Sequence, residues 1–132
     1  MREYLLSWSV GSNNDRDGGR KNNPTWVDVE SALVDAWKKS GTVTLDITRG
    51  PEVGPQSLQV QSENGRSIIT LGVDTGLDYI VRSYVGGENS ANQVEILGDL
   101  WSSGSICVDF NVVVKIFSEF LEAGDVSGNM LA

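Results

Sequence analysis

The segment from residue 13 to residue 24 carries the side chains most suggestive of metal chemistry in this chain of 132 residues. Its first six positions reproduce the start of an EF-hand calcium loop, with oxygen-bearing side chains at Asn13, Asp15 and Asp17 and a glycine at Gly18. The twelfth position needs a bidentate Glu, but Pro24 stands there. Three basic side chains would repel a cation: Arg16, Arg20 and Lys21. The composition therefore favours a solvated, mobile loop with Gly18-Gly19 at its tip over a calcium site.

The chain contains no histidine, which removes Ser-His and Cys-His catalysis and the commonest metal ligand. With a single cysteine, Cys107, a structural zinc site is also excluded. Cys107 lies in an apolar stretch and is expected to be buried and unreactive. Composition thus favours binding over catalysis, and we expect no catalytic residues, no metal and no cofactor.

One carboxylate pair keeps an enzymatic alternative open. Asp74 and Asp78 lie four residues apart in the stretch DTGLDY and could serve as the acid and base of a hydrolase. Such a pair would need a cleft and a raised pKa. The sequence around it is more typical of a turn between two strands.

The net charge is −8, with a pI near 4.3, so nucleic acid would be repelled. Up to residue 50, seven acidic residues balance seven basic ones, whereas the remainder has eleven acidic and three basic residues. The whole net charge therefore lies in the C-terminal portion. An acidic surface of this kind serves solubility, and it can also steer a basic partner towards the protein.

Length and composition predict a single domain spanning residues 1–132. No apolar run approaches the roughly 20 residues of a membrane span. The N-terminus MREYLLSWSV lacks the features of a signal peptide. The lone cysteine fits a reducing compartment, so we expect a cytoplasmic protein with no membrane partner.

The clearest helix covers residues 25–39, with Thr25 as cap, Asp28 three residues later and Gly41 placed to end it. A second helix is predicted over residues 109–124, where apolar side chains recur at helical spacing. We expect burial between the helices and a sheet for a set of large side chains: Trp26, Leu33, Trp37, Phe117, Phe120 and Leu121.

Strands are predicted at residues 3–10, 42–49, 56–63, 66–73, 78–85 and 93–97. Asn64-Gly65 is typical of a two-residue hairpin turn, which would pair Glu63 with Arg66 and Val60 with Ile69. The resulting fold class is α+β: a single antiparallel-rich sheet of about five or six strands, with two main helices packed on one face.

The stretches NPTWVDVESAL, SGTVTLDI, DYIVRSY, ILGDLW and FSEFLEAGDVS together resemble small immunity proteins of bacterial polymorphic-toxin and contact-dependent growth-inhibition systems. The resemblance implies a compact, non-catalytic protein that binds a cognate toxin domain and blocks it. Such toxins are often nucleases with basic surfaces, which an acidic inhibitor would complement. A non-catalytic adaptor that binds an unrelated protein is the alternative.

The partner-binding surface is expected in the acidic C-terminal portion, where charge and aromatic anchors occur together. The candidate residues are Asp78, Tyr84, Glu88, Glu95, Asp99 and Trp101. By strand parity, Asp78 and Tyr84 are expected on one sheet face with Arg82. Glu88 falls in the loop that follows, and the other three lie just beyond it.

Overall fold

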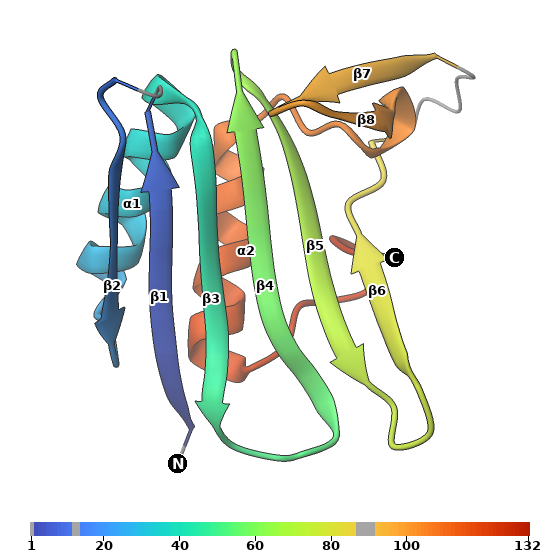
Figure 1. Ribbon diagram of the computed structural model, residues 1–132. Coiled ribbons are helices and arrows are strands. Elements are labelled where there is room, and N and C mark those ends of the chain that lie inside the picture. The colour runs from blue at the N-terminus through green and yellow to red at the C-terminus, as the bar shows by residue number, and fades with distance from the viewer. Residues whose placement is uncertain (1, 12–13, 87–91) are drawn as a thin grey trace.

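The structure is a computed structural model that describes residues 2–11, 14–86 and 92–132 (Figure 1). In chain order the strands and helices are β1 (Glu3–Val10), β2 (Asp17–Asn22), α1 (Trp26–Lys39), β3 (Gly41–Arg49), β4 (Gly54–Glu63), β5 (Arg66–Asp74), β6 (Tyr79–Ser83), β7 (Gln93–Ile96), β8 (Asp99–Ser102), the 3₁₀ turn η1 (Ser103–Ser105) and α2 (Phe110–Ala123). Among the described residues, no helix is long and apolar enough to cross a membrane.

Six strands form one antiparallel sheet in the order β2-β1-β3-β4-β5-β6, and β7 pairs with β8 in a separate two-stranded sheet. Both helices lie behind the large sheet as it is viewed in Figure 1, so the opposite face is open. The predicted α+β class, with five or six strands and two helices on one face, is confirmed.

The helix α1 begins at the capping residues that the sequence predicted. The Thr25 side chain accepts a hydrogen bond from the Asp28 amide, and the Asp28 carboxylate accepts one from the Thr25 amide. This bond from Thr25, together with Lys21, lowers the pKa of Asp28. The helix is capped at its other end by Ser40, with φ +70°, one residue before the predicted glycine.

The hairpin of β4 and β5 has the predicted register: Glu63 faces Arg66 and Val60 faces Ile69. Both turn residues, Asn64 and Gly65, have positive φ, as a type I′ turn requires. The side chains that alternate along these strands therefore divide between a buried face and an open face.

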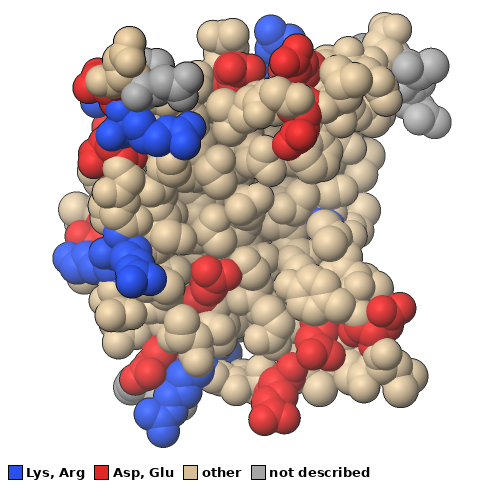
Figure 2. Space-filling view, viewed as in Figure 1, with Lys and Arg blue, Asp and Glu red and all other residues tan. Residues whose placement is uncertain are grey.

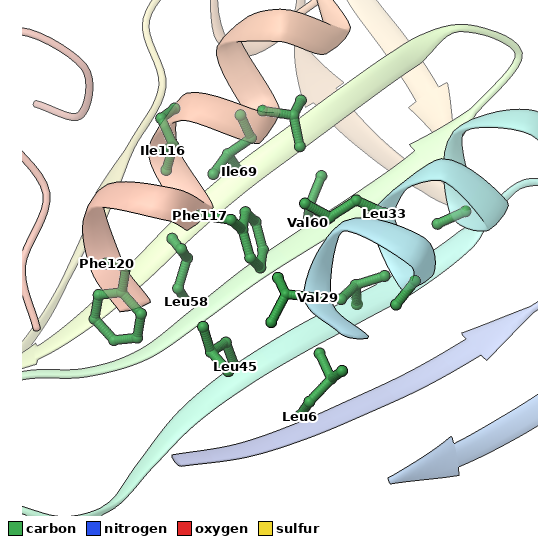
Figure 3. Packing of buried hydrophobic residues seen from close by; sticks show 14 of the residues in the cluster. Leu6, Val29, Leu33, Leu45, Leu58, Val60, Ile69, Ile116, Phe117 and Phe120 are labelled. Carbon is green, nitrogen blue, oxygen red and sulfur yellow. The ribbon is translucent and has the colours of Figure 1, made fainter. Parts of the chain in front are cut away.

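The core lies between the helices and the sheet. Phe117 and Phe120 of α2 pack with Leu33 of α1 over Leu45 and Leu58 of the sheet (Figure 3). These five side chains have at most 2% of their surface exposed. Of the residues predicted to be buried, three lie only partly buried at the margin of this cluster: Trp26, Trp37 and Leu121.

The prediction of a mobile loop across residues 12–24 is wrong for residues 17–22. These residues form β2, an edge strand paired with β1, and Gly18 and Gly19 face Ser9 and Trp8 instead of forming a tip. The extended backbone also disagrees with a curled calcium loop. All six residues of β2 are exposed, so the strand lacks the apolar alternation by which strands are predicted. Residues 12 and 13 lie outside the described residues.

The stretch DLWS is a second strand missed by the sequence pattern. It forms β8 and pairs with β7, so the predicted strand at residues 93–97 leaves the main sheet and joins a small hairpin. Ile96 is the buried residue of this hairpin and anchors it to the rest of the protein.

Candidate protein-binding surface

Hydrogen bonds between side chains and backbone amides stabilise the turn between β5 and β6. The Asp74 carboxylate accepts a hydrogen bond from the Gly76 amide at 2.8 Å, and the Thr75 hydroxyl accepts one from the Asp78 amide at 3.0 Å. The Asp78 carboxylate in turn accepts from the Tyr79 amide at 2.8 Å. These bonds leave Leu77 at the turn's outer side, fully exposed to solvent.

Large apolar side chains gather around this turn and the strand that follows it. The set comprises Val53, Leu77, Tyr79, Ile80 and Val81, and we call it the β6 patch. All five are exposed, from 46% for Ile80 to 100% for Leu77. Val53 comes from the β3–β4 loop, and its side chain lies 3.7 Å from where a Cβ on Gly76 would be. The patch therefore joins two turns that are far apart in the sequence.

Tyr79 has a defined place on the open face of the sheet. A Cβ at Gly72 would lie 1.9 Å from the Tyr79 hydroxyl oxygen, so the ring covers the space that a side chain on β5 would take. Gly72 is opposite Val81, and Tyr79 is opposite Asp74. The missing side chain at Gly72 thus allows an aromatic ring to lie across the last two strands while 54% of it stays exposed.

Carboxylates border the β6 patch. Glu52 lies beside Val53 in the β3–β4 loop, and Asp74 and Asp78 lie in the β5–β6 turn. In Figure 2, acidic side chains line the lower right of the open face, whereas basic side chains gather at its left, over β2. The middle of this face is mainly uncharged, since its paired positions carry Ser, Thr and Gln side chains: Ser7, Thr44, Gln59 and Thr70. The acidic group at the lower right is therefore separate from the basic group at the left, where acidic side chains also occur.

The structure separates the predicted binding residues. Asp78 lies at the β6 patch. Tyr84 does not share its surroundings, because its side chain packs against the core beside Cys107, and burial raises the pKa of Tyr84. Arg82 is opposite Leu71 on the helix-covered face, and its guanidinium binds the C-terminal segment. The expected patch on one face around Arg82 is thus not formed.

Glu95, Asp99 and Trp101 lie on the β7–β8 hairpin, at the end of the sheet opposite the β5–β6 turn (Figure 1). Glu95 and Asp99 are exposed, whereas Trp101 is partly buried, with an indole Nε1 that has no hydrogen-bond partner among the described residues. Glu88 lies outside the described residues. These residues therefore form a surface distinct from the one that contains Asp78.

The carboxylate pair of the hydrolase alternative has a structural role. Asp74 and Asp78 each accept a hydrogen bond from a backbone amide of the same turn, at Gly76 and Tyr79. The turn is at the surface, with Asp78 exposed. The turn interpretation of DTGLDY therefore accounts for both side chains, and the catalytic role stays a prediction.

A cleft of about 190 Å³ lies between α1 and the first two strands. Leu6 and Trp8 form its apolar wall, and Lys21 crosses its rim to Asp28 at 3.0 Å. In the described part of the chain, no group of three or more Asp, Glu, Cys or His side chains is arranged to hold a metal ion.

Sequence reasoning missed all five residues of the β6 patch for partner binding, since it chose charged and aromatic residues by charge and strand parity. A usable signal was present: Val53 and Leu77 are large apolar residues inside turn segments rich in Gly, Pro and Asp. Such residues have no core to enter and are exposed when the turn projects from the sheet.

Three comparisons place the chain among known proteins. The model of a family described as a family of unknown function (DUF6911) matches residues 6–130. No curated protein matches the chain. A solved structure titled "Crystal structure of a hypothetical protein from Neisseria gonorrhoeae" is similar, with a TM-score of 0.80, 22% sequence identity, and coverage of 96% of this chain and 92% of that one. At that identity the likeness concerns the fold alone.

Proposed function

The chain belongs to a family of unknown function (DUF6911), and we propose that it is an immunity protein that binds and neutralises a toxin domain through the β6 patch. The observation that carries the binding part of this proposal is the exposure of five apolar side chains along one edge strand and the adjoining turns, beside three carboxylates; Tyr79 and Val81 lie on the open face and Ile80 on the other. Apolar surface of this kind is typical of sites where another protein docks.

The composition of the β6 patch suits an interface. Tyr79 supplies an aromatic anchor, and such residues contribute much of the binding energy at interfaces. The Tyr79 amide donates a hydrogen bond to the Asp78 carboxylate, and the Tyr79 ring lies over Gly72. Tyr79 would therefore lose little conformational freedom on binding. Leu77 and Val53 extend the apolar area on the side of the turn.

The partner's chemistry follows from the charges around the β6 patch. Glu52, Asp74 and Asp78 border it, and the chain as a whole carries a net charge of −8. A basic protein surface would be attracted from a distance and held in register at close range. The resemblance of the sequence to immunity proteins supports a toxin domain, such as a nuclease, as that basic partner and the cytoplasm as the place of action.

The proposal is tested with the protein encoded immediately upstream of this chain's gene, because immunity genes follow their toxin genes. Cells that express the C-terminal domain of that protein should stop growing, and co-expression of this chain should restore growth. Calorimetry with an inactive variant of the domain should give a 1:1 complex. A non-toxic upstream domain, or growth arrest without rescue, would overturn the proposal.

An adaptor that binds an unrelated protein is the second candidate, since the same apolar patch would serve it. A binding partner recovered with this chain that has no effect on growth would favour the adaptor. Leu77→Ser and Val53→Ser should weaken either complex, because both side chains are exposed in the free protein and contribute apolar area to the patch.

A further inference from the structure

We propose that the outer edge of β6 receives an extended strand from the partner, which adds to the sheet at Tyr79–Val81. This inference rests on the proposed function, because it describes how the toxin domain would be held. The occupant is a short apolar strand with a basic side chain beyond its apolar residues. The backbone groups, the contrast between the two sheet edges and the bordering charges each support it.

The directions of the backbone groups follow from the pairing of β6. The Tyr84 amide donates to Ile69 on β5, whereas the amide and carbonyl of Ser83 pair with Ala132 on the outer side, at 3.2 and 3.0 Å. These directions alternate along a strand. Val81 therefore directs its N–H and C=O outwards, as Ser83 does, and within the described part of the chain no backbone hydrogen bond joins them.

The two edges of the sheet are protected differently. The β2 edge has the sequence DGGRKN, and its exposed charged side chains, Asp17, Arg20 and Lys21, oppose pairing with another strand. The β6 edge has Tyr79, Ile80 and Val81 in succession, all exposed. An edge with free backbone groups and apolar side chains is a template for strand addition.

The length of the added strand is limited at both ends. The C-terminal Ala132 occupies the edge at Ser83, and the Asp78 carboxylate already binds the Tyr79 amide. The free groups are therefore the Val81 amide, the Val81 carbonyl and the Tyr79 carbonyl. A strand of about three residues would use them, with its apolar side chains beside Tyr79 and Val81 on the open face and beside Ile80 on the other.

The bordering charges select a foreign strand over a second copy of this chain. A strand that continues past Tyr79 meets the acidic end of the sheet, where Asp74 and Asp78 favour Lys or Arg. A second copy paired antiparallel at Tyr79 and Val81 would run into the C-terminal Ala132, which occupies the edge at Ser83, and each copy carries a net charge of −8. The occupied edge at Ser83 and the repulsion between two acidic copies therefore oppose pairing of two β6 edges.

The test compares Val81→Pro with Val81→Thr, using the inactive toxin domain encoded upstream as the probe. Proline removes the outward N–H, which the free protein does not use, and edge strands tolerate it at such positions. Threonine keeps the N–H and the β-branched shape. Val81→Pro should weaken binding at least about tenfold, because a backbone hydrogen bond is lost and its partner is left unpaired. Val81→Thr should stay within about threefold.

Hydrogen exchange of the wild-type protein gives a second measurement that does not depend on any variant folding. The Val81 amide should exchange rapidly in the free chain and slowly in the complex, while the Arg82 amide, which faces β5, should be slow in both. Unchanged Val81 exchange in a formed complex, or full affinity of a folded Val81→Pro variant, would overturn strand addition and leave the proposed function intact. Failure of the domain to bind at all would overturn both. A free chain that sediments as a dimer, and as a monomer after Val81→Pro, would assign the edge to a second copy instead.

Discussion

At the scale of single residues, Arg82 joins the last strand of the main sheet to the C-terminal segment. Its guanidinium donates to the carbonyls of Val126 at 2.8 Å and Leu131 at 2.9 Å, and it contacts the Asp125 carboxylate at 3.2 Å. Val126 and Leu131 are themselves buried. One side chain thus satisfies two carbonyls that no helix or strand would pair.

Replacing Arg82 with lysine or alanine should destabilise the protein. Alanine leaves the carbonyls of Val126 and Leu131 without a donor, which costs about 1–3 kcal/mol per unsatisfied buried group. Lysine offers one compact ammonium and should recover only part of the loss. Urea unfolding would measure both, with Arg20→Ala on the exposed β2 as control. Equal stability of all three variants would contradict this role of Arg82.

The buried thiol of Cys107 and the partly buried phenol of Tyr84 make stability depend on alkaline pH. Burial raises the pKa of the Cys107 thiol from its ordinary 9.0, and burial together with the Cys107 charge raises the pKa of Tyr84 from 10.0. As pH rises, the unfolded chain therefore loses these protons before the folded chain does. The stabilising contribution is complete below about pH 9 and is lost as pH passes through the raised values.

The midpoint of urea unfolding should accordingly fall between pH 8 and about pH 10.5. Cys107→Ala removes the first group and should make the early part of this fall shallower relative to the wild type. The thiol should also resist alkylation in the folded protein at pH 8, since Cys107 is fully buried. If the urea midpoint falls equally with pH in the wild type and in Cys107→Ala, Cys107 does not contribute to the pH dependence of stability.

At the scale of elements, β2 is a strand because its backbone pairs with β1, without any apolar face of its own. Its glycines have different surroundings. A Cβ at Gly19 would lie 2.7 Å from the Trp8 ring, whereas a Cβ at Gly18 would lie 3.4 Å from a backbone oxygen. Gly19 therefore makes room for the indole, which packs against the core.

Gly19→Val should destabilise the protein by about 1–3 kcal/mol, because the added side chain forces the Trp8 ring out of place. Gly18→Val points to the open face and should have little effect or a slightly favourable one, since valine suits a strand. Thermal melts of the two variants would measure the difference. Equal melting temperatures would mean that the segment behaves as the loop expected from its composition.

At the scale of the whole molecule, two groups of acidic residues in the C-terminal portion lie at separate locations. One lies around the β6 patch and includes Glu52 and Asp78, and the other lies on the β7–β8 hairpin with Glu95 and Asp99. Both would attract a basic partner at long range, but the first borders the five residues of the β6 patch, whereas the second borders the exposed Leu100. Binding should therefore depend on the first group more than on the second.

Two double variants, each of which removes two negative charges, test the two acidic locations separately. Glu52→Gln with Asp78→Asn should slow association with a basic toxin domain more than Glu95→Gln with Asp99→Asn, because the lost charges lie at the contact itself. The difference should shrink with added salt, since charges are screened beyond about 8–10 Å at physiological ionic strength. Stopped-flow rates would measure it. A larger effect at the hairpin would assign the interface to the surface first expected from the sequence.

Much of the fold could be predicted because its signals are local. The cap at Thr25, the turn at Asn64-Gly65 and the apolar face of α2 each specify structure within a few residues. Together they determined the α+β class and the buried positions of Leu33, Phe117 and Phe120.

Other features depended on contacts between segments far apart in the sequence. The pairing of β2, the separation of the β7–β8 hairpin and the packing of Tyr84 against the core have no local pattern, because they follow from which edges and faces remain free after the core has formed. The candidate site is of this kind: Val53 comes close to Gly76 only when two turns lie at the same end of the sheet. The sequence by itself determined the elements and the core, and the tertiary structure decided which charges border exposed apolar surface, since strand pairing alone brings distant turns together.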